Sequence, residues 1–416
     1  MLNPALLIAA LSLIIWLYLL VARGDFWNLR SFDDDNATHP TPPTWPTVTA
    51  IIPARNEAET IAHTIASLTQ QNYPGKFSIV VVDDHSEDAT AKLAQSAVNP
   101  NKVEIAVLSA PPLPPGWTGK LSALNAGILH ATHGGAASAV PQSDAVNGAL
   151  APADSSPIYL WFTDADIVHA PDTLTRLVAR AEQNNLDLTS LMVLLRAQAP
   201  PERFLIPPFL FFFLMLYPPA KIANPRSRIA GAAGGCILLR SDALDRIGGL
   251  AAIRTEVIDD CALASAVKNS NSATNATSSS VPKTKIWMGV TRKSRSLRAY
   301  ATFAEIRDMI ARTAFTQLHY SALVLIGTLL GLAITYLAPI ALLFAHDTAT
   351  RLLALATWLI MSLLFLPTVR FYRISTHWAA TLPAAATFYA AATFLSALRY
   401  WTNRGAQWKG RSQAPK

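Results

Sequence analysis

The first residues of the chain form an apolar run that fits a membrane. Residues 4–22 contain no charged side chain and are followed at once by Arg23. A helix rising about 1.5 Å per residue would let this run cross a hydrocarbon layer roughly 30 Å thick. A cleaved signal peptide is the alternative, but the run is long for one and no small-residue cleavage pattern follows it. We expect a retained N-terminal transmembrane anchor over residues 1–22.

Three more charge-poor stretches lie near the C-terminus, at residues 313–346, 352–369 and 374–398. With 51% hydrophobic and 15% charged residues, the chain is too apolar for a wholly soluble enzyme. We expect a C-terminal membrane region over residues 313–401 with two or three helices. Pro383 is expected to interrupt the last stretch, which is either an interfacial or re-entrant helix or a true span.

The basic residues lie beside these apolar runs and predict the orientation. Eight Lys and Arg residues, against two acidic ones, occur from Lys283 to Arg312. Because Lys and Arg collect on the cytosolic side of membranes, we expect the region before this second membrane segment to be cytosolic. Basic residues at 370–373 and in the tail 402–416 also favour the cytosolic side. Both cannot be cytosolic if the stretch between them is a full span. The net charge of +7 reflects this bias or attraction to anionic headgroups and diphosphates, and we expect no nucleic-acid partner.

The region between the membrane segments alternates two patterns. Residues 23–46 are acidic and Pro-rich, and we expect them to form an exposed linker. From residue 47 to 312, β-prone runs alternate with apolar residues at helical spacing, which predicts a parallel sheet with helices on both faces. The expected strands cover residues 48–52, 77–82, 103–108 and 159–162, and the expected helices 57–70 and 86–96.

Three segments interrupt this alternation. Residues 134–157 and 268–285 are low-complexity inserts that cannot bury a core, so we expect surface loops. Residues 204–220 are uncharged and rich in large apolar side chains, but four prolines break them. We expect a helix in the membrane interface beside the active site, with a buried core helix as the alternative. Cys236 and Cys261 are expected to be free thiols in a cytosolic domain.

Two carboxylates, Asp164 and Asp166, follow the expected strand at 159–162. In a parallel sheet such residues lie at the carboxyl end of a strand, where ligands bind. Two carboxylates one residue apart can share a hard divalent cation that also holds diphosphate oxygens. The pattern alone is a weak signal that fits ordinary turn or capping residues better, so the rest of the sequence decides its interpretation.

Further segments, in a fixed order, carry a family resemblance. The sequences IIPARNE (51–57), VVVDDHS (80–86) and GKLSALNAG (119–127) precede the Asp164 pair, and Gly234-Gly235-Cys236, Gly248-Gly249 and VIDDCAL (257–263) follow it. Together they resemble the family 2 glycosyltransferases, which implies the GT-A fold, a mostly parallel α/β sheet flanked by helices. The resemblance covers nearly the whole chain and is greatest to the hopanoid-associated glycosyltransferases of bacteria.

The resemblance implies a nucleotide-sugar subsite near the start of the domain. Pro53, Ala54 and Glu57 would contact the base and ribose, with Asp84 on the same side. Asp83 is either a ligand contact or a strand-end cap.

The resemblance also implies the reacting groups. Lys120 would bind the nucleotide, and Asp164 and Asp166 would serve the donor diphosphate and a divalent metal, Mg²⁺ or Mn²⁺. Asp260 would be the catalytic base, with Asp259 beside it as a carboxylate that titrates together with it. A carboxylate within hydrogen-bond reach can take the proton of an acceptor hydroxyl, and single displacement implies inversion at the anomeric carbon.

One motif departs from the family pattern. Many membrane members carry Gln-x-x-Arg-Trp after the base, and residues 309–313 keep only Arg312. Arg312 would bind either the diphosphate or lipid headgroups, and a processive polymer synthase is not expected. His169, like the other histidines, is expected to be an ordinary surface or loop residue, because no paired metal-ligand spacing with cysteines occurs.

We expect an inverting, membrane-bound glycosyltransferase that moves a sugar from a nucleotide-sugar to a lipid acceptor, a hopanoid or other isoprenoid lipid, at the cytosolic side of the bacterial inner membrane. A polyprenyl-phosphate acceptor is the nearest alternative. A non-catalytic nucleotide-binding scaffold or transporter is another, although the spans contain almost no ionisable residues. A dinucleotide oxidoreductase is disfavoured, because residues 53–56 lack the glycine-rich turn it requires.

Overall fold

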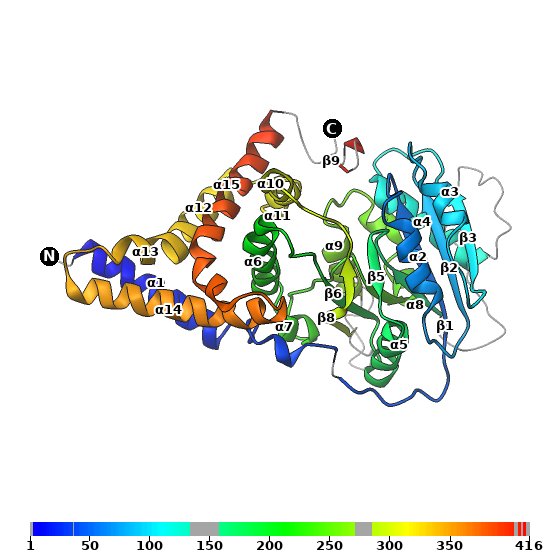
Figure 1. Cartoon of the computed structure of the whole chain (residues 1–416), viewed down its shortest axis with the longest axis horizontal. Helices are drawn as coiled ribbons and strands as arrows, with labels where there is room; N and C mark the ends of the chain where they lie inside the picture. Colours follow the sequence, from blue (N-terminus) through cyan, green and yellow to red (C-terminus); the bar gives the residue numbers. More distant parts are fainter. Residues whose placement is uncertain are drawn as a thin grey trace, which may run out of the picture.

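The computed structural model describes residues 3–35, 37–133, 158–270 and 285–402, with the backbone of 407–408 and 411–412 (Figure 1). The expected insert at 134–157 lies outside these residues, as do most of the insert at 268–285 and most of the tail at 402–416. In the described part, an α/β domain occupies one end of the molecule and an arm of long helices the other (Figure 1).

The α/β domain is built on an eight-stranded sheet with the order β3-β2-β1-β4-β7-β6-β8-β5. The pairs β1–β2, β2–β3, β1–β4 and β6–β8 are parallel, whereas β4–β7, β6–β7 and β5–β8 are antiparallel. The predicted α/β fold with a mostly parallel sheet is therefore confirmed, and antiparallel strands are added on one side. The strands are β1 Thr47–Ala54, β2 Phe77–Asp83, β3 Glu104–Ser109, β4 Ile158–Phe162, β5 Ile167–His169, β6 Leu188–Leu194, β7 Ile237–Arg240 and β8 Ile286–Ser296.

Both faces of the sheet are covered, which explains the apolar sequence of its central strand. Ile51 of β1 packs with Leu121 of α4, whereas the next residue, Ile52, packs with Ile61 and Ile65 of α2. Successive strand side chains point to opposite faces, so a strand between two helix layers is apolar throughout. The helices of this domain are α2 Ile61–Thr69, α3 Thr90–Gln95, α4 Gly119–His133, α5 Thr173–Asn184, α8 Ser241–Arg246 and α9 Asp259–Asn269.

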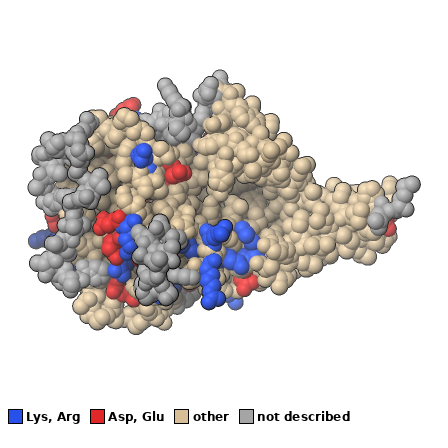
Figure 2. Space-filling view, turned by 180° about the vertical axis from the view of Figure 1, so that it is seen from behind, with Lys and Arg blue, Asp and Glu red and all other residues tan. Residues whose placement is uncertain are grey.

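The helical arm contains the membrane segments expected from the sequence. Five helices in the described residues are long and apolar enough to cross a membrane, at 4–21, 200–223, 322–342, 348–371 and 376–401. Seen from behind, the arm shows almost no charged side chains, and Lys and Arg gather where it joins the α/β domain (Figure 2). The helices are α1 Pro4–Val21, α6 Pro200–Leu216, α7 Pro219–Ala223, α10 Phe303–Ala311, α11 Ala314–Gln317, α12 Ala322–Leu332, α13 Ala338–Leu342, α14 Thr348–Phe371 and α15 Leu382–Trp401.

The N-terminal helix is joined to the C-terminal helices by a polar contact inside the arm. A π-turn over Ala333–Leu337 links α12 to α13. Pro339 has no N–H for the carbonyl four residues earlier, that of Thr335, and the Trp16 Nε1 of α1 donates to this oxygen at 2.9 Å. Because an unpaired carbonyl is costly in a bilayer, this bond stabilises the packing of α1 on the arm.

Two helices cross the arm rather than follow it. In Figure 1, α1, α13 and α14 extend along the long axis of the molecule, and α6 and α15 run across it, next to the α/β domain. A 3-10 helix covers Thr376–Thr381, and the regular α-helix α15 begins at Leu382 with Pro383 in its first turn, where proline is tolerated, so the expected stretch 374–398 changes helix type at this proline. Pro207 and Pro208 lie inside α6, which packs against α14 and α15. The interfacial location expected for residues 204–220 stays a prediction.

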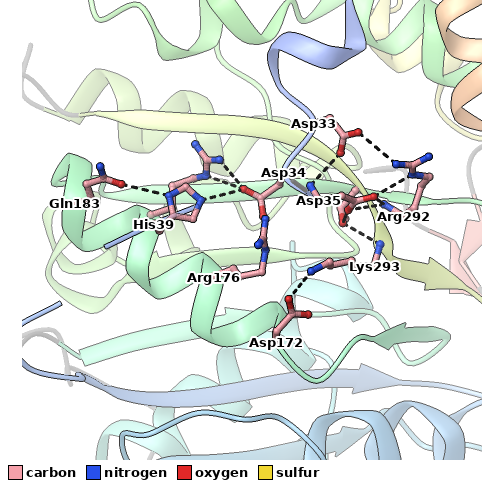
Figure 3. Close-up of polar contacts among 11 residues, drawn as sticks. Asp33, Asp34, Asp35, His39, Asp172, Arg176, Gln183, Arg292 and Lys293 are labelled. Carbon is pink, nitrogen blue, oxygen red and sulfur yellow. Dashed lines mark hydrogen bonds and ion pairs between the residues drawn. The ribbon is translucent and has the colours of Figure 1, made fainter. Parts of the chain in front are cut away.

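The first half of the segment after α1, residues 26–35, is packed against the domain, so the prediction of an exposed linker is wrong for this half. Phe26, Leu29 and Phe32 are buried. Asp34 is paired with Arg176 and Arg180 of α5 (Figure 3). Its neighbours bond to β8, where Asp33 and Asp35 both face Arg292 and Asp35 accepts from the Thr291 hydroxyl. Acidic composition led to the wrong prediction because these charges are compensated by arginines distant in sequence.

Candidate active site

A pocket opens where the carboxyl ends of β1 and β4 meet the start of α9. It has a volume of about 340 Å³ including its open mouth. Its apolar wall comes from α4, β4, β7 and the segment before α9, and its polar wall from charged side chains. The lining residues are Pro53, Lys120, Leu121, Leu124, Phe162, Thr163, Asp164, Gly234, Ile237, Leu250, Ile253, Asp259, Asp260 and Leu263. Four charged residues expected in the site are therefore brought together.

Lys120 is the cation of this pocket's polar wall. It lies in the first turn of α4, and its Nζ is 3.1 Å from Oδ1 of Asp164 and 3.3 Å from Oδ2 of Asp259. Burial alone would lower its pKa, but the nearby charges of Asp164, Asp259 and Asp260 raise it above the ordinary value. The ammonium group is therefore charged at neutral pH and is placed to meet an anionic ligand.

Asp260 is a half-buried carboxylate held by backbone donors. Its Oδ2 accepts from the Gly234 N–H at 2.9 Å, and its Oδ1 from the Cys261 N–H at 2.7 Å. Burial and then the charge of Asp259 raise its pKa to about 6, although Lys120 and the two N–H groups lower it. A Cβ at Gly234 would lie 3.2 Å from the Lys120 Nζ and 3.4 Å from the Asp260 Oδ2, so this position has room for little more than glycine.

Asp166 lies outside this cluster. It contacts Ser296 and Arg298, for which the sequence predicts no role in the site. Its Oδ2 accepts from the Ser296 hydroxyl at 2.9 Å and is 3.3 Å from Nε of Arg298. The Nη2 of the same arginine is 2.6 Å from Oε1 of Glu57. Arg298 thus joins a carboxylate expected near the nucleotide to one expected near the metal. No local sequence pattern predicts the contact between Arg298 and Asp166, because it depends on the antiparallel pairing of Ile167 with Ser296.

The residues expected to bind the nucleotide lie at the ends of β1 and β2. Pro53 lines the pocket, and the Asp84 N–H donates to the Ala54 carbonyl at 2.8 Å, which holds the two strand ends together. Oδ2 of Asp83 accepts from the Ser86 N–H, but its buried Oδ1 has no hydrogen-bond partner among the described residues. A buried carboxylate oxygen without a partner is costly, and a donor group on a bound ligand would remove that cost.

A buried network supports the turn that carries the acidic pair. The Thr163 hydroxyl lies 2.9 Å from Nε2 of His169, whose Nδ1 is 2.8 Å from the Ser294 hydroxyl. Burial lowers the pKa of His169 to about 3, so the ring is neutral. The expectation that His169 is a surface or loop residue is wrong, because β5 places it in the core behind Asp164. Its role is to position the turn.

Arg312 lies near Tyr300, which follows β8. It is exposed at the C-terminal end of α10. Burial raises the pKa of Tyr300, and Arg298 and Arg312 both act to lower it, while Asp166 and Asp164 raise it slightly. Both expectations for Arg312, diphosphate binding or headgroup binding, remain predictions.

The acidic pair has the chemistry of a divalent-metal site but is not a complete one. Asp164 and Asp166 offer carboxylate oxygens, which suit Mg²⁺ or Mn²⁺ when phosphates and water supply the other ligands. Within 3–35, 37–133, 158–270 and 285–402, no group of three or more His, Cys, Asp or Glu side chains is arranged to hold a metal. Asp164 and Asp166 therefore fit a metal that binds together with a diphosphate. Such a metal would compete with Lys120 for Asp164 and with Arg298 for Asp166.

A sheet of this order, with a carboxylate pair after β4 and a half-buried carboxylate opening α9, is the arrangement expected of a glycosyltransferase of the GT-A type. The family comparison agrees. The family model for glycosyl transferase family 21 matches residues 153–413, and the model for glycosyl transferase family 2 matches residues 49–134. Because the first match covers more than half of the chain, the protein belongs to glycosyl transferase family 21.

One solved structure supports the fold. The mannosyltransferase PcManGT from Pyrobaculum calidifontis, in complex with GDP-Man and Mn²⁺, matches with a TM-score of 0.53 and 18% identity, over 95% of this chain and 99% of that one. TarS from S. aureus matches at 0.38 and 14%, over 85% and 55%, and glucosyl-3-phosphoglycerate synthase from Mycobacterium tuberculosis at 0.35 and 15%, over 66% and 79%. A comparison with curated proteins found no match. The protein is a glycosyltransferase, and its family supports a nucleotide-sugar donor.

Proposed function

We propose that the protein is a membrane-bound, inverting glycosyltransferase that transfers a sugar from a nucleotide-sugar to the hydroxyl of a lipid. The observation that carries the proposal is the pocket in which the half-buried carboxylate of Asp260 lies beside the Lys120–Asp164 ion pair. One wall of this pocket is apolar, which suits a lipid acceptor. Family 21 membership is consistent with a lipid-linked acceptor, and the sequence resemblance favours a hopanoid or other isoprenoid lipid.

Each charged group in the pocket has a part in the proposed reaction. Asp260 takes the proton of the acceptor hydroxyl as it attacks the anomeric carbon, a contribution of about 10² to 10⁴ in rate. Lys120 stabilises the negative charge that develops on the leaving diphosphate. Asp164 and Asp166 would hold Mg²⁺ or Mn²⁺, which when bound supplies further positive charge at the diphosphate. The Mn²⁺ and GDP-Man bound by PcManGT support this assignment.

The acceptor would reach the pocket from the membrane. Lys and Arg gather at the junction between the arm and the α/β domain, as expected for the cytosolic surface of an inner-membrane protein of bacteria (Figure 2). Helices α6 and α15 run across the arm at this junction (Figure 1). The Tyr217 hydroxyl, just after α6, lies 3.0 Å from Oε1 of Gln317 in α11. The acceptor path is proposed to run between these two segments.

The test is sugar transfer by the purified full-length protein in detergent. Labelled UDP- and GDP-sugars would be supplied with Mg²⁺ or Mn²⁺, and with either a hopanoid alcohol or a polyprenyl phosphate as acceptor. We expect transfer to the hopanoid alcohol by the wild type and a loss of about 10² or more in Asp260→Asn. The matched control is Asp245→Asn, which changes an exposed aspartate on α8 and should leave transfer unchanged.

The alternatives give different results. Transfer to polyprenyl phosphate alone would keep the enzyme class and replace the acceptor. An anomeric configuration retained from donor to product would contradict single displacement. A folded wild type that bound no nucleotide-sugar and transferred nothing would end the catalytic proposal.

A further inference from the structure

Arg298 connects two parts of the site that no short sequence motif connects. Its Nη2 is 2.6 Å from Oε1 of Glu57, and its Nε is 3.3 Å from Oδ2 of Asp166. Arg298 lies two residues after the end of β8. This strand pairs with β5, which begins immediately after Asp166. The guanidinium therefore lies between the strand ends where the nucleotide is expected and the carboxylate pair where the metal is expected.

The guanidinium covers these carboxylates from the solvent side. The side chain of Arg298 is 34% exposed, whereas those of Glu57 and Asp166 are 14% and 12% exposed. Asp166 keeps a second partner, the Ser296 hydroxyl, that does not depend on the arginine. Asp166 would therefore keep a hydrogen bond if Arg298 moved away.

Arg298 is a cation, and it contacts the carboxylate of Asp166, which is expected to bind a metal cation. A divalent cation and a guanidinium at one carboxylate repel each other, so metal binding at Asp166 must displace Arg298. A diphosphate that arrives with the metal offers the arginine a new partner, because the planar guanidinium binds phosphate oxygens through two parallel hydrogen bonds.

We propose that Arg298 is a diphosphate-binding residue that Glu57 and Asp166 hold in the donor-free protein and that passes to the donor when metal and nucleotide bind. The inference rests on the proposed function, because it takes Asp166 as a metal ligand. It assigns Arg298 two opposite effects, as a competitor of the metal in the free protein and as a ligand of the nucleotide in the complex. A purely structural arginine would favour both binding steps or neither.

The experiment measures both affinities on the purified full-length protein in detergent. Titration calorimetry gives the affinity for Mn²⁺ alone, and then for UDP and GDP at saturating Mn²⁺. In Arg298→Gln we expect Mn²⁺ to bind about twofold to fivefold more tightly, as fits removal of a partly exposed ion pair. We expect the preferred nucleoside diphosphate to bind about tenfold or more weakly, as fits loss of hydrogen bonds to a charged group.

Two further variants make the result specific. Arg298→Lys keeps the charge but loses the fork geometry, so it should regain part of the nucleotide affinity and little of the bridging to both carboxylates. Arg295→Gln removes an exposed arginine three residues earlier on β8 and should match the wild type in both titrations. Equal melting temperatures would show that each variant is folded.

The outcomes separate this inference from the proposal on which it rests. If Arg298→Gln weakens both Mn²⁺ and nucleotide, Arg298 only shapes the site and the inference is wrong; the same holds if neither affinity changes. A wild type that binds neither UDP nor GDP removes the proposed function and the inference together.

Discussion

Asp260 has the surroundings that a general base needs at neutral pH. Two backbone N–H groups fix its oxygens, and burial followed by the charge of Asp259 raises its pKa to about 6 from the ordinary value of 3.8. By linkage, the folded state binds this proton more tightly than the unfolded state does, so the shift lowers stability as the pH rises between these two values. The raised pKa therefore lowers the stability of the fold, and it gives a base that is ionised at pH 7 and basic enough to take a proton.

The first prediction concerns the pH dependence of transfer. Since the base acts only when deprotonated, we expect kcat/KM to rise about tenfold per pH unit up to about pH 6 and to level off above it. Lys120 lowers the pKa of Asp260, so in Lys120→Met we expect the rising part of the pH profile, measured on the residual activity, to shift to higher pH. Rates from pH 4.5 to 8 at saturating metal would test both. A limb near pH 4 in the wild type, or an unchanged limb in Asp260→Asn, would contradict the assignment.

Some site residues could be predicted from the sequence and others could not. Asp164, Lys120 and Asp260 lie in short segments whose order resembles a known family, and the structure brings them into one pocket. Arg298 lies 132 positions after Asp166, and their contact depends on how two antiparallel strands pair. Local sequence carries no information about that pairing, so the arginine could only be grouped with its basic neighbours.

At the scale of elements, the alternation of strands and helices was predictable, because helical spacing and β-prone runs are local signals. The burial of the segment after α1 was not. Its acidic, Pro-rich composition is typical of an exposed linker, yet Asp33, Asp34 and Asp35 bind arginines from α5 and β8 (Figure 3). Composition reports the charge of a segment but not whether a partner compensates it.

The second prediction tests whether this segment stabilises the domain. Burial alone would raise the pKa of Asp34, but the His39 hydrogen bond and the charges of Arg180 and Arg176 lower it below the ordinary 3.8. The stabilisation is therefore complete above about pH 4 and is lost as the pH falls through the lower folded pKa. At pH 7, Asp34→Asn leaves two arginines without their carboxylate, and we expect a loss of about 3 kcal/mol.

Thermal unfolding in detergent at pH 7 would measure that loss. Asp25→Asn is the matched control, because Asp25 lies in the same segment but is exposed. Equal melting temperatures for the two variants would mean that the ion pairs of Asp34 contribute nothing measurable. Activity should follow stability in this case, since Asp34 lies outside the pocket.

Over the whole molecule, an interfacial α15 would resolve the conflict between the basic residues at 370–373 and those of the tail at 402–416, which lie before and after this helix. If α15 lies in the interface, the residues after α14 and those after α15 are on one side, and the positive charges of both segments face the cytosol. The N-terminus and the turn between α13 and α14 lie together at the far end of the arm (Figure 1). On this arrangement we expect three spans, namely α1, the α12–α13 pair and α14, with the α/β domain and the tail on the cytosolic side.

The last prediction is therefore the sidedness of single cysteines introduced at Phe344, Ser375 and Thr402. Phe344 is 84% exposed, Ser375 and Thr402 are exposed, and the native thiols of Cys236 and Cys261 are buried, so background labelling should be low. With a membrane-impermeant maleimide, we expect Phe344→Cys to react only from outside in right-side-out vesicles, and Ser375→Cys and Thr402→Cys only in inverted vesicles. Because Ser375 and Thr402 flank α15, labelling of Thr402→Cys from outside would make α15 a full span and place the basic tail on the wrong side for its charge.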